Sequence, residues 1–353
     1  MSAISPSPPA PAVSIAVDAM GGDNAPEAVV AGAAAAAGPG LQILLTGRPE
    51  QLGALLAEHR PGGVVRVIPA EDWITMEEGS LASWRRPRSS LAVACQLVRR
   101  GQAAAVVSAG STGGIVATAR LRLRALPGVT RPGLAAVLPT SPKPTILIDA
   151  GAIADPKPEM LVQFAQLGAA YAEIAHAVSE PRVGLLTIGA EPGKGNKLAR
   201  RAYELLQADP PHGGSPIRFE GNVEGGDLMA GRVDVVVTDG FAGNIALKAI
   251  EGAAGFAAGE LRAALLGSVT ARLGTVLQRR VLRDLAARVD RETYGGAALL
   301  GMEGTVVVAH GAATAKGVAA ACRLAADLAR GQITDRIRER LGPGRAVHFR
   351  RRI

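Results

Sequence analysis

Short apolar runs, each followed by a glycine-rich turn and then by a helical pattern, recur along most of the chain. Early in the sequence, residues 14–18, 41–46 and 64–68 are such runs, and residues 50–59 carry a helical pattern between the second and the third. The turn after the first run reaches Pro26, which suits the start of a helix. This alternation of strand and helix predicts a parallel sheet with crossover helices.

The same alternation continues beyond a break at residues 74–90. That stretch is polar and basic, and it has two interpretations: a solvated connection, or a patch that faces a partner. The further expected strands are residues 104–108, 134–138, 145–149 and 305–309. Helices are expected up to Arg100, from 158 to 178, and up to Arg330.

Three glycine-rich turns lie close together in the centre of the sequence. Residues 184–189 lead into the turn 193–196, residues 220–227 form the second turn, and residues 233–244 contain the third. In each case apolar residues give way to Gly, Asn or Asp before a helical pattern begins. Proteins with parallel sheets build their sites at such strand ends, and backbone N–H groups at the turns suit an anion.

Residues 245–290 show no strand pattern and are predicted to form a helical hairpin broken near residues 266–268. An apolar stripe runs along its first part and continues after a shift of phase, while arginines lie largely elsewhere around the helices. The stripe comprises Leu261, Leu265, Val269, Leu273, Leu277, Leu282, Leu285 and Val289. An apolar helix face must be buried against something, and the core of the same subunit is the default partner. Because the strand–helix alternation already covers the sheet, pairing with the same hairpin of a second subunit is the hypothesis, with the tip of the hairpin touching an anionic membrane.

Composition narrows the possible functions. With 48% hydrophobic but only 3% aromatic residues among 353, the core is expected to be aliphatic, with Ala and Gly at close helix–sheet contacts. The net charge of +8 fits an acidic partner, an anionic membrane surface or simply a basic surface. Cys95 and Cys322 lie in apolar helical runs without metal-ligand spacing, which predicts buried thiols in a reducing compartment and no metal site.

The two ends of the chain differ from the rest. Residues 1–12, rich in Pro, Ser and Ala, lack the basic start and apolar run of a signal peptide and are interpreted as a disordered leader. Residues 13–341 are expected to form a single α/β domain, with two lobes as an alternative, and residues 342–353 a basic tail. No apolar run is long and uninterrupted enough to span a bilayer.

Several long motifs occur in a fixed order, and together they are more specific than any one glycine turn. They are AVDAMGGDNAPEAVV, VSAGSTGG, GKGN, EGNVEGGD, DGFAGNIALKAIEG and YGGAALLGMEGTVVVAHGAATAKG. With these motifs the chain resembles the bacterial phosphate acyltransferase (PlsX) family from about residue 14 to about residue 328.

The resemblance implies an enzyme that makes acyl phosphate from acyl-acyl carrier protein and inorganic phosphate, for phosphatidic acid and phospholipid synthesis. It implies a three-layer α/β/α sandwich with a mostly parallel sheet, like phosphate acetyltransferase and isocitrate dehydrogenase, and a homodimer. No cofactor, metal ion or nucleic acid is expected. The location expected is the cytoplasm, with peripheral contact at the inner face of an anionic membrane near a membrane-bound glycerol-3-phosphate acyltransferase.

Four residues are candidate catalytic groups. Lys194 lies in a glycine turn after an apolar run, which favours a charge contact with phosphate over a plain surface lysine. Asn244 either donates to phosphate or to the oxyanion, or is an ordinary turn residue. Asp239 either orients Lys248 or Lys194 or caps the helix that follows. His310 either protonates the leaving sulfur, binds phosphate, or is a structural histidine.

The remaining candidates, for binding substrate or phosphate, lie in the same turns. Lys248 follows Asn244 by one helical turn, so the two share a helix face. The others are Asp18, Gly21, Gly22, Asp23, Asn24, Ser111, Thr112, Gly193, Gly195, Asn196, Gly240 and Gly243. No Ser-His-Asp or Cys-His set is recognisable, which predicts direct transfer without an acyl-enzyme.

Four positions depart from the family pattern. Ser111, Ile153 and Thr187 stand where the family usually has Asn, and Ala190 stands where it usually has Glu. These changes leave two alternatives open: a phosphate acyltransferase that uses coenzyme A, and a non-catalytic relative that binds an acyl carrier or phosphate. A nicotinamide dehydrogenase is disfavoured, because no G-x-G-x-x-G turn separates the first strand from its helix.

Overall fold

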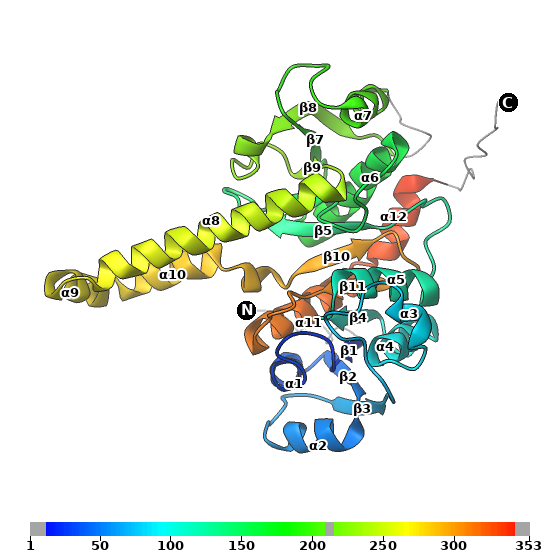
Figure 1. The fold of residues 1–353 in the computed structure, drawn as a ribbon, viewed down its shortest axis with the longest axis vertical. Helices are drawn as coiled ribbons and strands as arrows, with labels where there is room; N and C mark the ends of the chain where they lie inside the picture. The colour runs from blue at the N-terminus through cyan, green and yellow to red at the C-terminus, as the bar shows by residue number, and fades with distance from the viewer. Residues whose placement is uncertain (1–11, 209–214, 343–353) are drawn as a thin grey trace, which may run out of the picture. The chain divides into compact units, whose positions relative to one another are not determined.

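The structure is a computed structural model that describes residues 12–208 and 215–342. Most of the expected leader and tail, residues 1–11 and 343–353, lie outside the described residues. The chain divides into two compact units. Figure 1 shows the chain coloured from blue at the N-terminus to red at the C-terminus. The first unit is Met1–Arg124 with Gly304–Arg330, and the second is Ala125–Glu303 with Gly331–Ile353.

The first unit is built on strands that all run parallel. Their order is β3 (Val65–Pro69), β2 (Leu41–Gly47), β1 (Val13–Asp18), β4 (Ala105–Ser108) and β11 (Thr305–Val308). Strand interiors are almost wholly aliphatic, as buried parallel strands are. The expected strands at 14–18, 41–46, 64–68, 104–108 and 305–309 are therefore confirmed to within a residue.

Helices cover both faces of this sheet. On one side α1 (Glu27–Ala36) packs against α11 (Ala315–Arg330), and on the other α4 (Ser90–Arg99) packs against α5 (Thr112–Arg122), as Figure 1 shows. The shorter helices α2 (Pro49–Ala57) and α3 (Ala82–Arg85) lie beside them. At Gly32 a Cβ atom would lie 2.5 Å from the carbonyl oxygen of Ala315, so glycine is what lets α1 approach α11.

The second unit has a mixed sheet. Its order is β10 (Ala297–Leu300), β5 (Gly133–Leu138), β6 (Thr145–Ile148), β9 (Val235–Val237), β7 (Arg182–Thr187) and β8 (Arg218–Glu224). Strands β6, β9, β7 and β8 run parallel, whereas β5 is antiparallel to both β10 and β6.

Helices also cover both faces of the second sheet. Helix α6 (Pro158–Ala175) lies on one face, where a Cβ at Gly168 would be 2.5 Å from Val235, which confirms the expected glycine at a close helix–sheet contact. Helices α7 (Lys197–Gln207) and α12 (Ile333–Leu341) pack against α6. The start of α8 (Gly240–Leu266) packs through Leu247 on the other face. The predicted three-layer α/β/α architecture is confirmed.

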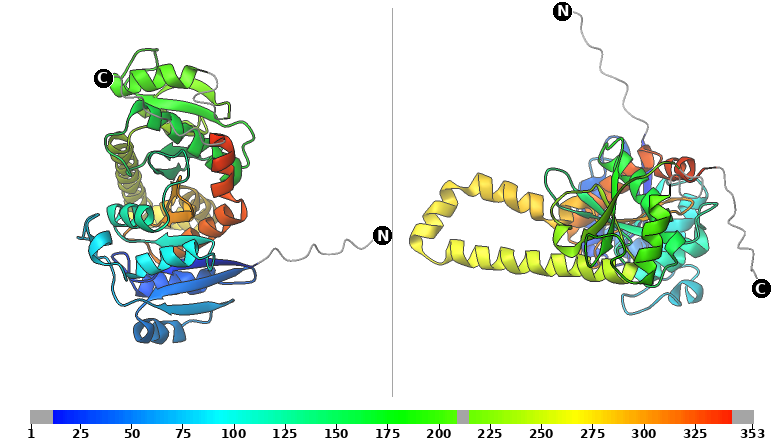
Figure 2. Two further views of the ribbon diagram at one scale, coloured as in Figure 1. Left: turned by 90° about the vertical axis from the view of Figure 1, so that its right-hand side faces the viewer. Right: turned by 90° about the horizontal axis from the view of Figure 1, so that it is seen from above.

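The predicted hairpin consists of α8, α9 (Val269–Leu277) and α10 (Arg279–Val289), and Figure 2 shows its two arms. The break at residues 266–268 is confirmed, since α8 ends at Leu266 and Ser268 caps α9. The second arm is divided again at Gln278, which the pattern did not predict. Much of the apolar stripe is exposed: Leu261, Val269, Leu273, Leu277 and Leu285.

Three parts of the fold differ from the prediction. The second glycine turn, expected at 220–227, is wrong: residues 220–224 belong to β8, and only a single turn η2 (Gly225–Asp227) follows. Strand β10 and helix α12 were not predicted. Within 74–90, α3 interrupts the expected loop, and Arg86 pairs with Asp72 and Glu78.

Two findings concern the described part of the chain as a whole. No helix within residues 12–208 and 215–342 is long and apolar enough to cross a membrane. Within the same ranges, no group of three or more His, Cys, Asp or Glu side chains could hold a metal ion. Both cysteines are buried as predicted, and burial raises the pKa of each thiol to about 12.

Candidate active site

The carboxyl ends of three parallel strands meet at one edge of the second unit. Ile148 of β6 and Leu185 of β7 both lie opposite Val237 of β9, so the three strands end nearly level. Neighbouring strands lie about 4.8 Å apart. The turns after β6 and β7 and the start of α8 after β9 therefore lie at the same edge, and they carry Asp149, Lys194 and Asn244 respectively.

The turn after β7 presents Lys194. Gly193 and Gly195 have φ of +88° and +92°, a conformation that residues with a Cβ rarely adopt. The Lys194 ammonium lies 4.0 Å from a Glu191 carboxylate oxygen, and both side chains are more than half exposed. Because this ion pair is long and exposed to solvent, it holds the lysine only weakly. The ammonium charge therefore remains available to an anion.

Asn222 on β8 fixes this turn. Its side-chain Nδ2 donates to the carbonyl oxygen of Glu191 at 2.8 Å, and the backbone N–H of Lys194 donates to the same oxygen at 3.2 Å. At the end of the turn, the Asn196 side-chain oxygen accepts from the backbone of Ala199 and caps α7. The cap uses only the amide oxygen, so the NH₂ group of Asn196 keeps its capacity to donate to an anion.

Asp149, directly after β6, organises the neighbouring turn. One carboxylate oxygen accepts from the backbone N–H groups of Leu134, Gly151 and Ala152 at 2.9, 3.1 and 2.9 Å, and the other accepts from Ile153 at 2.8 Å. The side chain is fully buried. Burial raises the pKa of Asp149 above its ordinary value, and the four hydrogen bonds oppose that rise.

The start of α8 is locked onto the Asp149 turn. The backbone N–H of Gly240 donates to the carbonyl oxygen of Ile153 at 2.8 Å. At Gly243 a Cβ would lie only 2.0 Å from the Asp149 carbonyl oxygen, so no other residue fits. The Asn244 side chain lies beside Gly151, whose Cβ would be 3.4 Å from it. The structure thus brings Gly240, Gly243 and Asn244 together around Asp149.

Asp239 and Lys248 have partners of their own on α8. Asp239 accepts from the backbone N–H of Ala242 at 2.8 Å and caps the helix, which is one of the two roles considered for it. Lys248 lies one turn beyond Asn244 as predicted, and it pairs with Glu251 at 2.8 Å.

The first unit holds a second group of candidate residues. One carboxylate oxygen of Asp18 accepts from Ser90 Oγ at 2.5 Å, and the other accepts from Ser108 Oγ at 2.7 Å. A Cβ at Gly21 would lie 2.6 Å from Asp18, so the turn passes directly over this carboxylate. Burial raises the pKa of Asp18, while the hydrogen bonds from Ser90 and Ser108 oppose the rise.

The turn after β1 is joined to the turn after β11. The backbone N–H of Asp23 donates to the Gly311 carbonyl oxygen at 2.8 Å, and Asn24 Nδ2 donates to the carbonyl oxygens of Ala312 and Ala313 at 3.3 Å each. Gly22, with φ of +118°, passes the same carbonyl of Gly311. His310 Nδ1 accepts from the backbone N–H of Ala312 at 3.2 Å, which fixes the orientation of the ring.

Three of the four positions that depart from the family pattern have local roles. Ser111 caps α5, which begins at Thr112, and its hydroxyl donates to the Glu78 carbonyl oxygen at 3.2 Å. The Thr187 hydroxyl donates to the carbonyl oxygen of Gly189 at 2.8 Å, within the turn before Lys194. Ile153 takes part in the Asp149 turn through its backbone N–H and carbonyl groups, which any residue except proline supplies.

Sequence reasoning did not single out four residues that hold these turns. Asp149, Asn222, Ser90 and Ser108 each act on a segment distant in the sequence. The available signal was Asp149 itself, a carboxylate directly after a buried strand. For the two serines and the asparagine, the sequence offered no comparable sign.

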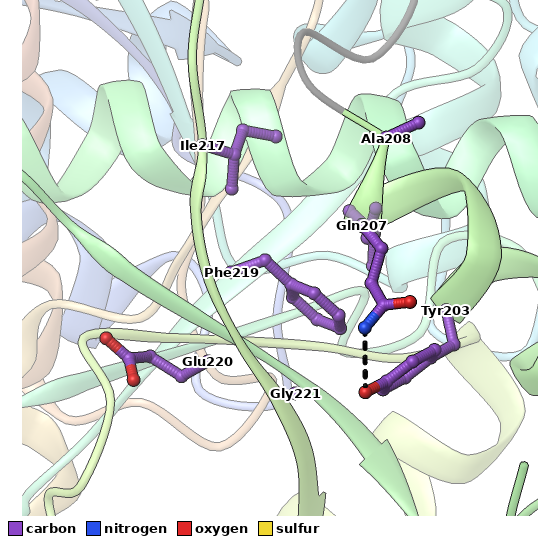
Figure 3. A pocket seen from close by; sticks show the side chains of 8 residues that line it. Tyr203, Gln207, Ala208, Ile217, Phe219, Glu220 and Gly221 are labelled. Atoms are coloured by element: carbon purple, nitrogen blue, oxygen red, sulfur yellow. Dashed lines mark hydrogen bonds between the residues drawn. The ribbon is translucent and has the colours of Figure 1, made fainter. Parts of the chain in front are cut away.

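A separate hollow of about 560 Å³ lies between α7 and β8 (Figure 3). Tyr203 packs edge-on against Phe219 and accepts a hydrogen bond from Gln207 at 3.2 Å. The hollow is also lined by Ala208, the last described residue before the undescribed stretch 209–214. The lining includes none of the candidate site residues, so this hollow is not the site.

Comparison with known proteins points to one family. Residues 13–336 match the family described as Fatty acid synthesis protein. A protein of Thermobifida fusca named Phosphate acyltransferase is 62% identical over 332 residues, which cover 94% of this chain and 92% of that protein. A Phosphate acyltransferase of Thermus thermophilus is 48% identical over 327 residues, which cover 93% of this chain and 98% of the relative.

Among solved structures, a phosphotransacetylase from Streptococcus pyogenes has a similar fold. The TM-score is 0.59 at 18% sequence identity, and the match covers 90% of this chain and 94% of that one. At this identity the likeness concerns the fold alone.

Proposed function

This chain belongs to the phosphate acyltransferase family of fatty acid synthesis proteins, and from that premise we propose that its donor is an acyl-acyl carrier protein. It is an acyltransferase. In the proposed reaction an oxygen of inorganic phosphate attacks the thioester carbonyl carbon, the carbon–sulfur bond breaks, and its electron pair leaves with the sulfur. The products are acyl phosphate and the free carrier thiol.

This reaction requires the protein to position the reactants and stabilise their charges more than to transfer protons. Inorganic phosphate has its second pKa near neutral pH, roughly one unit above the value of about 6 for phosphate esters, so a substantial fraction is already the dianion. A thiol with a pKa of about 8.5 leaves as thiolate without strong acid assistance. The protein must hold phosphate against the thioester, offset its charge and stabilise the oxyanion.

The observation that carries the proposal is the shared strand edge of the second unit. Lys194 offers a weakly held positive charge there, and Asn196 and Asn244 offer amide donors. We assign the phosphate charge to Lys194 and assign the two asparagines to phosphate and to the developing oxyanion. Lys248 lies on the Asn244 face of α8 in an ion pair with Glu251, and it is a further candidate for binding phosphate.

The turn residues of the first unit are proposed to bind substrate. Asp18 shapes the turn that carries Gly21, Gly22, Asp23 and Asn24, and Ser111 and Thr112 begin α5. His310 remains a candidate for binding phosphate or for protonating the leaving sulfur.

The choice of donor tests this proposal. Purified protein with phosphate is expected to form acyl phosphate from acyl-acyl carrier protein at a much higher kcat/KM than from the matching coenzyme A thioester. The reverse preference would identify a coenzyme A-dependent enzyme. Binding of the carrier or of phosphate without turnover would identify a non-catalytic relative.

We predict that no covalent acyl-enzyme forms. Both cysteines are buried and their thiol pKa is raised to about 12, so neither is a ready thiolate. Mass spectrometry of the protein mixed with the acyl donor in the absence of phosphate is expected to show the unmodified mass. A stoichiometric acyl adduct on any side chain would refute direct transfer.

The hairpin is proposed to pair with the hairpin of a second subunit. Gly255 and Gly259 on α8 have nothing within 4 Å of where a Cβ would be. Glycine in a helix interior costs about 1 kcal/mol relative to alanine, and the four-residue spacing leaves a smooth strip where another helix can approach closely. Together with the exposed stripe residues, this strip supports a homodimer.

The tip of the hairpin is proposed to contact an anionic membrane. Val269, Leu273 and Leu277 are each more than 60% exposed there, next to Arg272 and Arg279. Exposed apolar side chains beside cations suit the boundary of an anionic bilayer. Acyl phosphate would then be released near a membrane-bound glycerol-3-phosphate acyltransferase, and we propose that it serves phosphatidic acid synthesis on the cytoplasmic side.

Deleting residues 265–276 behind a short linker tests both roles of the hairpin. We expect the variant to shift from dimer to monomer in solution and to lose sedimentation with anionic liposomes, because the tip and part of the pairing surface are gone. Liposomes of zwitterionic lipid serve as the control for charge. An unaltered dimer would refute the pairing, and unaltered binding to anionic liposomes would refute the membrane role.

A further inference from the structure

The segment 74–90, where the strand–helix alternation breaks, carries two exposed apolar side chains at α3. Leu81 and Trp84 are 66% and 70% exposed, more than any other large apolar side chain that the structure describes in the first unit. The second tryptophan of the chain, Trp73, lies instead under Arg48, whose guanidinium carbon is 4.2 Å from the ring centroid. Neighbouring exposed apolar side chains of this size are typical of an interaction surface.

The geometry of α3 places a positive charge beside these two side chains. Trp84 and Arg85 follow Leu81 by three and four residues, and residues at these spacings share a helix face. Ala82 and Ser83 are buried, and α3 packs against α5, as Figure 1 shows. We name Leu81, Trp84 and Arg85 the α3 patch.

The charge that this segment presents to solvent is positive. Residues 81–88 contain three arginines and no acidic residue. Arg86 is held by two carboxylates of the same segment, but Arg85 has no ion-pair partner among the described residues. Arg88 pairs with Glu71 at 2.9 Å, where the two side chains are 74% and 70% exposed, and so exposed a pair is weak. The patch therefore fits a partner with an acidic surface.

The residues just before the patch lie against two turns that carry candidate site residues. The Ser111 hydroxyl at the start of α5 donates to the carbonyl oxygen of Glu78 at 3.2 Å. At Gly311, in the turn after β11, a Cβ would lie 2.7 Å from the methyl carbon of Met76. Because Leu81 is only three residues beyond Glu78, the α3 patch borders the turns of the first unit that are proposed to bind substrate.

We infer that the α3 patch is the docking surface for the protein part of the acyl donor, the acyl carrier protein, which presents an acidic surface to it. This inference rests on the proposed function, which makes the donor a thioester attached to a protein. Such a thioester reaches its site only if the edge of the site accepts the surface of the carrier. Tryptophan and arginine are enriched among the residues that dominate binding energy at protein interfaces, and positive charge favours encounter with an acidic partner.

The test is the double variant Leu81→Ala/Trp84→Ala, assayed with acyl-acyl carrier protein and with the coenzyme A thioester of the same acyl group. The KM for the carrier donor is expected to rise at least about 10-fold, as for truncation of an interface tryptophan. The kcat at saturating carrier donor, the KM for phosphate and kcat/KM for the coenzyme A thioester should stay nearly unchanged. Both side chains are exposed, so their truncation leaves no cavity in the core.

Arg85→Glu tests the charge of the patch separately. The association rate with the carrier is expected to fall several-fold and to depend less on salt, because a steering charge is reversed. Arg66→Glu is the matched control, since it reverses the charge of an exposed arginine on β3 of the same unit. It should leave the rate and its salt dependence nearly unchanged. Equal losses in the two variants would show an effect of net charge and would contradict docking at α3.

Three outcomes for the double variant would overturn the inference. The first is an unchanged KM for the carrier donor, and the second is an equal loss of kcat/KM for both donors. The third is a change of oligomeric state in solution, which would make α3 a contact between subunits.

Equilibrium binding of the carrier without its acyl group separates this inference from the proposed function. If the unaltered protein binds the carrier but makes no acyl phosphate, the proposed function fails, and weaker binding by the double variant still supports the patch. If acyl phosphate forms from the carrier donor and the double variant binds the carrier as well as the unaltered protein does, the patch is refuted and the function stands. Absence of carrier binding by the unaltered protein also refutes the patch.

Discussion

Replacing Lys194 with alanine is expected to lower kcat/KM for acyl phosphate formation by about 10²–10³-fold, which corresponds to about 2.7–4 kcal/mol of transition-state stabilisation. The lysine lies in a turn that two glycines with positive φ allow, and Asn222 fixes the Glu191 carbonyl on which the turn closes. Its only close acid in the described residues is Glu191, at 4.0 Å. The charge is thus positioned by the backbone and remains available for phosphate.

The matched control is Lys197→Ala, which removes an exposed lysine three residues later, at the start of α7. It lowers the net charge by the same amount and should leave kcat/KM nearly unchanged. Lys194→Arg should recover part of the activity, because it keeps the charge but changes its reach. Thermal melting should be equal for all three variants. Near-normal turnover of Lys194→Ala at saturating phosphate would remove this residue from the mechanism.

The second large effect is expected from Asp149→Ala, which should make the folded protein less stable. The substitution leaves the backbone N–H groups of Leu134, Gly151, Ala152 and Ile153 without their acceptor. A buried donor without an acceptor costs about 1–3 kcal/mol, so the free energy of unfolding should fall by about 3 kcal/mol or more. Urea denaturation measures this directly.

Two companion variants make the stability test specific. Asp149→Asn keeps an oxygen for three of the four donors but turns an NH₂ group towards Ile153, so its loss should be smaller than that of alanine. Asp335→Ala removes an exposed aspartate paired with Arg338 and should cost less than about 1 kcal/mol. A loss for Asp149→Ala no larger than that for Asp335→Ala would show that the carboxylate does not hold the turn.

The local pattern of apolar residues and glycines in the sequence was sufficient to predict most of the fold. Apolar runs such as Leu134–Leu138 within β5 and the break beside Gly267 depend on residues that are neighbours in the sequence. Strand β10, by contrast, is the short run Ala-Ala-Leu-Leu between glycines. It pairs antiparallel with β5, so the strand–helix alternation that marks parallel strands does not predict it. The segment 220–224 contains the glycine and asparagine of a turn, yet pairing with β7 makes it a strand.

The candidate site was predictable only in part, for a similar reason. Gly193, Gly195, Gly240 and Gly243 could be found because turns and helix starts have local requirements. The role of Asp149 depends on β5 and on the turn beyond it, and that of Asn222 depends on a turn 31 residues earlier. Such contacts exist only once the sheet has formed, so a single sequence does not contain them as a pattern.

The most direct test of acyl transfer to a phosphate oxygen is a single reaction with phosphate labelled by ¹⁸O at all four oxygens. With acyl-acyl carrier protein as donor, the account predicts acyl phosphate that keeps all four labelled oxygens, one of them bonded to the acyl carbon, and one free carrier thiol released per acyl phosphate formed. Mass spectrometry of the product and thiol titration give both quantities. Release of the thiol with free fatty acid and no acyl phosphate, or a product that has lost a labelled oxygen, would contradict it.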